Sequence, residues 1–134
     1  MNFKIKIASL IVLYLPDKFN LINCISSQLH QVDKILIIAN SKIDENILLS
    51  FNDDRIEIVY NIENLGIAVA QNIGIRMLKD QKYDFVLLSD QDSNFPSNYV
   101  SDMSNKYFSL SKKYKIAALC PLFFNSQNKK IYPM

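Results

Sequence analysis

Short apolar runs alternate along this sequence with longer segments of helical spacing, and that alternation limits the fold more than any other feature. Between the apolar runs, apolar side chains recur every three or four residues, as they do along one face of a helix. The order predicts an α/β fold: a Rossmann-like, doubly wound, mostly parallel sheet with helices on both faces. The five predicted strands are residues 5–14, 34–39, 55–60, 84–88 and 115–120.

Four helices are predicted to link or follow these strands. The first begins with Asp17 as its N-cap and extends to about Gln31, and its expected buried residues are Phe19, Ile22, Ile25 and Leu29. A short helix is expected at residues 45–51, and Pro96 opens the last one. For the helix at residues 64–79, the expected core residues are Leu65, Ile67, Ala68, Ile73, Met77 and Leu78.

Length and composition favour one globular domain over residues 1–134. Hydrophobic residues make up 49% of the chain and charged residues 21%, and a domain of this size buries roughly two thirds of its unfolded surface. The net charge of +2 does not indicate a nucleic-acid binder, which gathers Lys and Arg in a patch. The apolar run at residues 5–15 is too short to span a bilayer. Cys24 and Cys120 follow no metal-ligand spacing and are expected to be reduced core thiols of a cytoplasmic protein.

The chain holds only two glycines, Gly66 and Gly74, where average usage would give about nine. Both lie in one short stretch that also carries Asn72. Because Asn and Gly each cost roughly 0.5–1 kcal/mol in a helix interior relative to Ala, the stretch is expected to serve a purpose. One interpretation is binding, with free N–H groups around Gly66 for an anion and Asn72 near a ligand. The other interpretation is tight packing of the helix against the sheet.

Residues 90–93, with the sequence Asp-Gln-Asp-Ser, directly follow a fully apolar predicted strand. Two carboxylates two residues apart can face one hard cation together, and Mg²⁺ or Mn²⁺ commonly bridges protein carboxylates to substrate phosphates. Such a cation neutralises a departing diphosphate. The alternative is a polar turn that caps the next helix. Tyr14 and the pair Asn40 and Ser41 end two other predicted strands, so all three segments are expected to meet at one crevice.

Two motifs together carry a resemblance to a known family. Residues 61–75 read N-x-E-N-L-G-I-A-x-A-x-N-x-G-I, and D-Q-D-S begins 16 residues after Gly74. The runs I-V-L-Y-x-P-D at residues 11–17 and I-L-I-I-A-N-S at residues 35–41 add to it. With these motifs, the chain resembles the family-2 inverting glycosyltransferases, and most of all the group that transfers L-rhamnose from dTDP-L-rhamnose.

The resemblance implies the GT-A fold, with this chain as its nucleotide-sugar-binding half. It implies a divalent cation, Mg²⁺ or Mn²⁺, held mainly by Asp92, with Asp90 near the ribose or the metal. The other implied donor-site residues are Tyr14 near the base, Asn40 and Ser41 in the nucleoside pocket, and Asn64, Gly66 and Asn72 along the wall.

The chain departs from the family pattern at two positions and in its length. Relatives often carry Asp where this chain has Ala39, and a basic residue where it has Gln71. The missing carboxylate contacts the base in relatives, and losing such a hydrogen bond costs about 1–3 kcal/mol. Relatives also continue into an acceptor-binding half that supplies a general base. The chain is therefore expected to be truncated before that half, and no catalytic residue is predicted in it.

The predicted function is that of a metal-dependent glycosyltransferase domain in polysaccharide biosynthesis, which binds a nucleotide-diphospho-sugar donor for transfer to a glycan or lipid-linked glycan. Its expected location is the cytoplasm, with peripheral association at the inner face of the membrane as a variant. One alternative is a non-catalytic remnant or binding module that holds nucleotide sugar. Another is a response-regulator-like receiver, which needs an acidic pair after its first strand, where this chain has Tyr14 and Leu15.

Overall fold

The computed structural model describes residues 4–124 and 131–132. It divides into two compact units, residues 1–99 and 100–134. The first unit contains four strands, β1 (Ile7–Leu13), β2 (Lys34–Ala39), β3 (Ile56–Tyr60) and β4 (Phe85–Ser89). Three helices connect them: α1 (Lys18–Leu29), α2 (Glu45–Leu49) and α3 (Gly66–Asp80). The first four predicted strands and the first three predicted helices are therefore confirmed, with small differences at their ends.

The four strands form one parallel sheet in the order β3-β2-β1-β4. β1 pairs with β2 from Ala8 opposite Lys34, and with β4 from Ile7 opposite Phe85. β1 and β2 are almost continuously apolar because both of their faces are covered, as in other parallel sheets. The predicted α/β class with a parallel sheet is confirmed.

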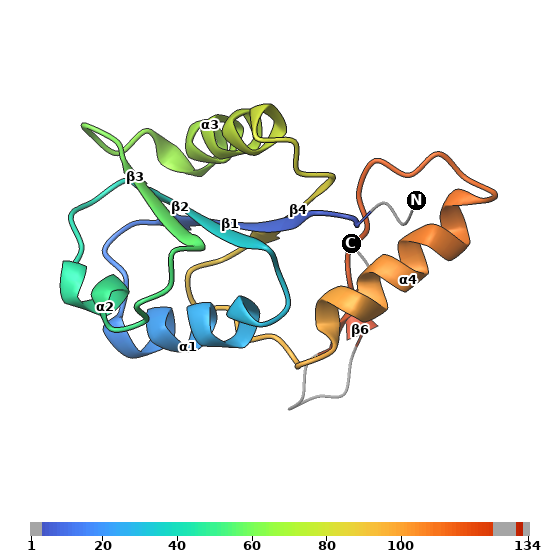
Figure 1. Ribbon diagram of the computed structural model, residues 1–134, viewed down its shortest axis with the longest axis horizontal. Coiled ribbons are helices and arrows are strands. Elements are labelled where there is room, and N and C mark those ends of the chain that lie inside the picture. Colours follow the sequence, from blue (N-terminus) through green and yellow to red (C-terminus); the bar gives the residue numbers. More distant parts are fainter. Residues whose placement is uncertain (1–3, 125–130, 133–134) are drawn as a thin grey trace. The chain divides into compact units, whose positions relative to one another are not determined.

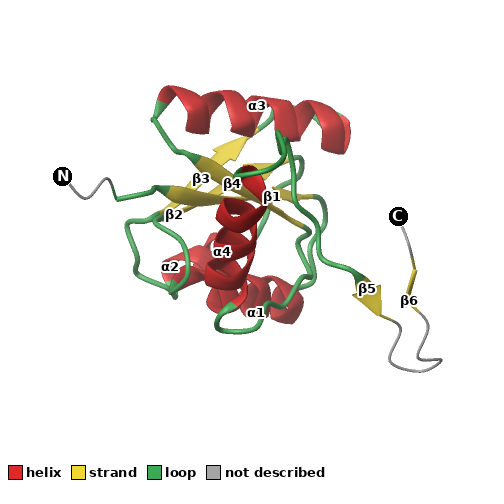
Figure 2. Cartoon of the chain, turned by 90° about the vertical axis from the view of Figure 1, so that its right-hand side faces the viewer, coloured by secondary structure: helices red, strands yellow, loops and turns green. Residues whose placement is uncertain are grey.

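Helices cover both faces of this sheet (Figures 1 and 2). Figure 1 shows α3 above the sheet and α1 and α2 below it. Successive side chains of a strand point to opposite faces, so the strands supply two apolar layers. The layer beneath α3 combines Ala8, Leu10, Leu36 and Ile38 of the strands with Ala70 and Leu78 of the helix.

Helix α1 begins as predicted but turns a different face toward the sheet. Asp17 is its N-cap, and the carboxylate accepts a hydrogen bond of 2.9 Å from the backbone N–H of Asn20. The expected burial of Phe19 is wrong, because its side chain is 74% exposed. The buried residues of α1 are Leu21, Cys24, Ile25 and Gln28.

Helix α3 packs very closely against the centre of the sheet. A Cβ atom placed on Gly74 would overlap Cδ1 of Leu10 and lie 2.8 Å from its Cδ2, closer than such atoms approach. The packing interpretation of Gly74 is therefore confirmed. The expected core face was partly wrong: Ile67 is 57% exposed, whereas Leu78 is buried as expected. The unexpected buried residue is Ala70, which the predicted stripe did not include.

The second unit differs from the prediction. It holds most of α4 (Tyr99–Ser111), the predicted helix after Pro96, and an antiparallel pair of short strands, β5 (Phe123–Phe124) and β6 (Ile131–Tyr132). The predicted fifth strand at residues 115–120 does not form. Its sequence, KIAALC, contains one β-branched residue, and alanine favours strands poorly. Cys120 is consequently exposed rather than part of a core, while Cys24 is buried as expected.

No helix in the described part of the chain is long and apolar enough to cross a membrane. The helices of the first unit have 12, 5 and 15 residues.

Candidate functional site

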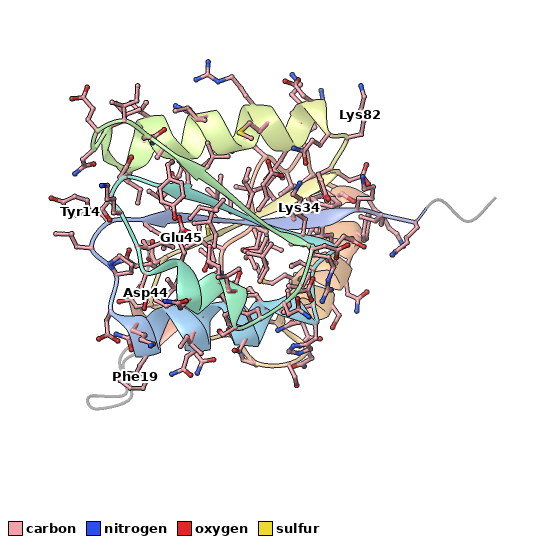
Figure 3. The ribbon with its side chains drawn as sticks, turned by 60° about the vertical axis from the view of Figure 1, so that its left-hand side comes forward. Tyr14, Phe19, Lys34, Asp44, Glu45 and Lys82 are labelled. Carbon is pink, nitrogen blue, oxygen red and sulfur yellow. The ribbon has the colours of Figure 1, made fainter. Side chains whose placement is uncertain are left out.

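The strand order contains one reversal of direction, and the candidate site lies there. The chain moves outward from β1 to β2 to β3 and then returns to pair β4 with the other side of β1. In open parallel sheets, ligands bind beyond the carboxyl ends of the strands at such a reversal. The ends of β1 and β4 carry Tyr14 and Asp90. Figure 3 shows Tyr14 at this carboxyl edge, with Lys34 and Lys82 at the opposite edge.

Residues 90–93, which we name the acidic loop, follow β4 directly. The side chains of Asp90 and Asp92 are exposed, whereas Gln91 between them is half-buried. The Gln91 Oε1 atom accepts a 2.9 Å hydrogen bond from the backbone N–H of Tyr14. Its Nε2 atom donates to the Tyr14 carbonyl at 3.3 Å. Gln91 thus joins the acidic loop to the end of β1, and the two carboxylates on either side of it remain available to a ligand.

The ends of β1 and β2 are joined in a similar way. The hydroxyl of Ser41 accepts a 2.9 Å hydrogen bond from the backbone N–H of Leu15. Leu15 has φ 44°, in the left-handed region that a branched side chain rarely adopts. It precedes Pro16, which restricts the residue before it. The Tyr14 side chain, 51% exposed, stands beside this turn and is free to stack against a planar ligand.

Asn40 connects the end of β2 to the start of α3. Its side chain is only 6% exposed. Its Oδ1 atom accepts hydrogen bonds from the Asn61 side chain at 2.7 Å and from the Leu65 N–H at 3.4 Å. Its Nδ2 atom donates to the Gly66 carbonyl at 3.3 Å. Both ends of the Asn40 amide are therefore engaged within the protein, so the residue holds the loop before α3 in place.

The glycine-bearing helix start differs from what the sequence suggested. Gly66 has φ 75°, and no atom lies within 4 Å of the place where a Cβ would sit, so the residue is needed for its backbone conformation. The expectation of a free N–H at this residue is wrong, because the Gly66 N–H donates to Oδ1 of Asn64 at 2.9 Å. Asn72 is exposed. It lies two residues from both Ala70 and Gly74, which at about 100° per residue places it on the outer face of α3.

Buried polar side chains lie directly beneath the acidic loop. Gln28 of α1 is fully buried, and its Nε2 atom donates to the Ser89 hydroxyl at 3.1 Å and to the Cys24 carbonyl at 2.9 Å. The thiol of Cys24 in turn donates to the Asp90 carbonyl at 3.3 Å. Burial raises the pKa of the Cys24 thiol, against the opposing effect of its hydrogen bonds to Ser89, Ser93 and Gln28. The thiol is therefore held in its neutral form, as a donor.

The acidic loop supplies a donor set that suits a cation shared with a ligand. Among residues 4–124 and 131–132, no three His, Cys, Asp or Glu side chains gather to hold a metal by themselves. Mg²⁺ does not need such a cage, because it is usually bound by one or two carboxylates together with phosphate oxygens and water. The exposed carboxylates of Asp90 and Asp92 meet that requirement in number and in chemistry.

On the part of the surface that the structure describes, two open hollows lie near the sheet, and the acidic loop lines neither of them. One, of about 460 Å³, lies beside the ends of β1 and β2. Its lining residues are Leu15, Pro16, Lys18, Lys42, Ile43, Asp44 and Ile47. The other, of about 670 Å³, lies between α2 and the start of β3, at the amino edge of the sheet. The site is therefore assigned from the strand reversal and the acidic pair, with the first hollow adjoining it at Leu15.

Sequence reasoning missed three residues of this edge: Gln91, Gln28 and Asn61. Gln91 lies inside the acidic motif, where only the carboxylates attracted interest. Gln28 lies on the buried face of α1, one turn after Cys24 and Ile25, and a polar residue at helical spacing from such residues is the signal that could have revealed it. Asn61 belongs to the quoted motif but received no role, although it follows β3 directly.

A parallel sheet with one reversal, and an acidic pair at that reversal, define a doubly wound α/β domain of the ligand-binding class. Residues 10–118 match the family described as Glycosyl transferase family 2. This match covers most of the chain, and the chain belongs to that family. The resemblance noted from the motifs is therefore confirmed, and the receiver-like alternative is wrong.

Two individual proteins show further similarity. The dTDP-rhamnosyl transferase RfbF of Shigella flexneri is 26% identical over 129 residues, which are 96% of this chain but only 42% of that protein. The chain thus spans less than half the length of this relative. The crystal structure of 4-diphosphocytidyl-2C-methyl-D-erythritol synthase superposes with a TM-score of 0.58 at 12% identity, and the match covers 96% of this chain and 66% of that one. At this identity the second similarity concerns the fold alone.

Proposed function

We propose that this chain is the donor-binding part of a metal-dependent glycosyltransferase that uses a nucleotide-diphospho-sugar. The observation that carries the proposal is the exposed acidic pair at the reversal of strand order, joined to Tyr14 through Gln91. Similarity to a dTDP-rhamnosyl transferase favours dTDP-L-rhamnose as the donor. The acceptor in this proposal is a surface glycan or a lipid-linked glycan.

In this proposal the acidic loop holds the diphosphate end of the donor. Asp92 is the main ligand of a Mg²⁺ or Mn²⁺ ion, and Asp90 lies toward the ribose or shares the ion. The bound ion supplies neutralisation of the charge that develops on the departing nucleoside diphosphate. Both carboxylates face solvent, so a hydrated ion can reach them without any rearrangement of the core.

The nucleoside end of the donor lies along the ends of β1 and β2. The exposed ring of Tyr14 stacks against the base, and Ser41 lines the pocket while it holds the Leu15 turn. Asn40 supports the pocket indirectly, because its amide is hydrogen-bonded to the loop before α3. In the position where relatives often have Asp, the buried Ala39 offers no carboxylate to the base. We therefore expect weak discrimination between dTDP and UDP.

The wall of the donor site is assigned to Asn64, Gly66 and Asn72. Asn64 and Gly66 bond to each other and form the turn that faces the carboxyl edge. Asn72 lies on the outer face of α3, so it contacts the donor only if the sugar extends over that helix. This makes Asn72 the weakest of the assigned residues and the one whose replacement should matter least.

The transfer step itself needs a general base to remove the proton of the acceptor hydroxyl. We assign no residue of this chain to that role. The proposal therefore separates donor binding, which these residues provide, from transfer to an acceptor. The alternative is a non-catalytic module that holds the nucleotide sugar. In either case we expect a cytoplasmic protein, and contact with the inner face of the membrane if the acceptor is lipid-linked.

Calorimetry with dTDP-L-rhamnose and Mn²⁺ tests the donor site. An Asp92→Ala variant loses a charge-assisted ligand worth roughly 1.5–3 kcal/mol, so its affinity should fall about 10- to 100-fold. The matched control is Asp80→Ala, which removes an exposed carboxylate from the last residue of α3 and should leave affinity unchanged. Equal binding by wild type and the Asp92→Ala variant would remove the metal role of Asp92.

Donor binding without transfer is the second arm of this test. Wild-type chain that binds the donor more tightly in Mn²⁺ than in EDTA supports the metal-dependent proposal. Absence of binding to both dTDP-L-rhamnose and UDP-sugars under either condition would overturn it. Incubation of the chain with donor and a rhamnan-type acceptor then separates the two alternatives, because only an enzyme releases dTDP faster than the background hydrolysis.

A further inference from the structure

Four polar side chains form a connected set in the layer between the sheet and α1. They are Ser9 of β1, Cys24 and Gln28 of α1, and Ser89 at the end of β4. Ser9, Cys24 and Gln28 are fully buried, and Ser89 is 7% exposed. The other buried residues of α1, Leu21 and Ile25, are aliphatic, so an apolar side chain would be the ordinary choice at these positions. None of the four was assigned a part in donor binding.

Gln28 is the centre of this set. Its Oε1 atom accepts a hydrogen bond from the Ser9 hydroxyl. Its Nε2 atom donates to the Ser89 hydroxyl, the Cys24 carbonyl and the Cys24 sulfur, at 3.1, 2.9 and 3.1 Å. Within the described part of the chain, no buried side-chain N or O lacks a partner. A buried network that is fully satisfied in this way favours one arrangement of its members.

The network ends on the first peptide of the acidic loop. The Asp90 carbonyl accepts hydrogen bonds from the Ser89 hydroxyl at 3.1 Å and from the Cys24 thiol at 3.3 Å. It also accepts the Ser93 N–H at 3.1 Å, which closes the loop. Fixing this carbonyl fixes the plane of the peptide between Asp90 and Gln91. That plane includes the Cα atom of Asp90, from which the proposed metal-binding side chain extends.

We propose that Gln28, acting through Ser89 and Cys24, is a positioning residue for the acidic loop and thereby for divalent-cation and diphosphate binding. This inference rests on the proposed donor-binding function. In this proposal the buried face of α1 contributes to cation binding only indirectly, since Gln28 contacts neither the cation nor the donor. Partners that orient metal ligands from behind commonly change metal affinity about 10- to 100-fold when they are removed.

The first test removes the network without leaving a cavity. Gln28→Met keeps the length and shape of the side chain and removes both of its polar atoms. Measured by calorimetry, the Mn²⁺-dependent affinity for dTDP should fall about tenfold or more. The affinity for dTDP in EDTA should stay the same, because the nucleoside contacts lie on β1 and β2. A purely structural role would change both affinities alike, or neither.

A pair of variants at Cys24 provides a conservative rescue. Cys24→Ser retains a donor to the Asp90 carbonyl and should keep Mn²⁺-dependent affinity close to that of wild type. Cys24→Ala removes the donor and should weaken it as Gln28→Met does. Ile25→Val is the matched stability control, since Ile25 is equally buried on the same helix and has no polar atom to offer the loop. It should lower stability without changing Mn²⁺-dependent affinity.

Hydrogen exchange of the loop amides gives a readout that needs no ligand. The Ser93 N–H should be protected in wild type and Ile25→Val, and should exchange roughly tenfold faster or more in Gln28→Met, because the carbonyl that it bonds is no longer held. If wild type binds no dTDP but this difference is seen, the donor-binding function fails while the positioning of the loop stands. If wild type binds dTDP and Gln28→Met matches it in exchange and in Mn²⁺-dependent affinity, the positioning inference alone is overturned.

Discussion

Amide side chains make many of the connections at the carboxyl edge of this sheet. Where the strands end, Gln91 bonds both backbone groups of Tyr14, and Asn40 bonds the loop before α3. An amide carries a donor and an acceptor in one plane, so it can replace the pairing that a neighbouring strand would have given. The charged side chains are thereby left for a ligand. Single residues, rather than loop length or composition, fix the geometry of this edge.

The two cysteines should differ sharply in reactivity. Cys24 is buried with a raised pKa, while Cys120 is exposed. Because the thiolate is the reactive form, one thiol per chain should react with Ellman's reagent within minutes at about pH 8. The second should react only after denaturant is added. Cys120→Ser should abolish the fast reaction and Cys24→Ser should not, and two fast thiols in wild type would show that Cys24 is accessible.

At the scale of helices and strands, the sequence was a better guide to the positions of the elements than to which face of each helix is buried. β1 and β2 were predictable because apolar residues fill both of their faces. The helical spacing of α1 predicted the helix, but the choice of its buried face was wrong. Phe19 was counted as a core residue because it is apolar, and Gln28 was left out because it is polar. At the site, the carboxylates were apparent from their position after β4. The bonds of Gln91 were not, since they depend on which strand lies beside β4.

The segment at residues 115–120 shows a second limit of sequence reasoning. Its apolar composition predicted a fifth strand, yet it forms none. A strand exists only where another strand offers its backbone groups, and composition carries no information about that partner. The same limit explains why β5 and β6 were not predicted, because two-residue strands show no periodicity.

The contact between Gly74 and Leu10 should behave as a coupled pair. Leu10 is buried, and the methyl group of Gly74→Ala has to displace its side chain, so this overpacking of the core should destabilise the chain by about 1–3 kcal/mol. In a Leu10→Ala background the same change should stabilise by up to about 1 kcal/mol, since Ala favours helices over Gly. Urea unfolding of the wild type, the two single variants and the double variant measures the coupling free energy. Equal effects of Gly74→Ala in both backgrounds would mean that the two residues are independent.

At the scale of the molecule, the parallel sheet and the candidate site belong to one compact unit. The family match at residues 10–118 extends beyond that unit, and the dTDP-rhamnosyl transferase relative is more than twice as long as the matched region. The sheet, its two helical layers and the acidic loop all lie before residue 100. Donor binding is therefore a property to be sought in the first unit.

Shortening the chain after Lys112 tests whether the parallel sheet needs the residues that follow α4. The deletion keeps α4 whole and removes β5 and β6, which pair only with each other among the described strands. The shortened chain should unfold in one cooperative transition in urea, followed by circular dichroism. A chain that ends before β4, at residue 83, should not, because β1 would lose a neighbour on one side. Loss of cooperativity in the longer of these two chains would show that the sheet depends on residues after Lys112.

The hydrogen bonds that shape the carboxyl edge join uncharged groups: Gln91 to Tyr14, Ser41 to Leu15, Asn40 to Gly66, and Gln28 to Ser89. Mobile ions screen interactions between charges and have little influence on such neutral bonds. These hydrogen bonds should thus change little with ionic strength, whereas the interactions of the Asp90 and Asp92 carboxylates with a charged ligand should weaken as salt is added. Any weakening of nucleotide binding by added salt would then report the electrostatics of the cation and the diphosphate, free of contributions from a changing scaffold.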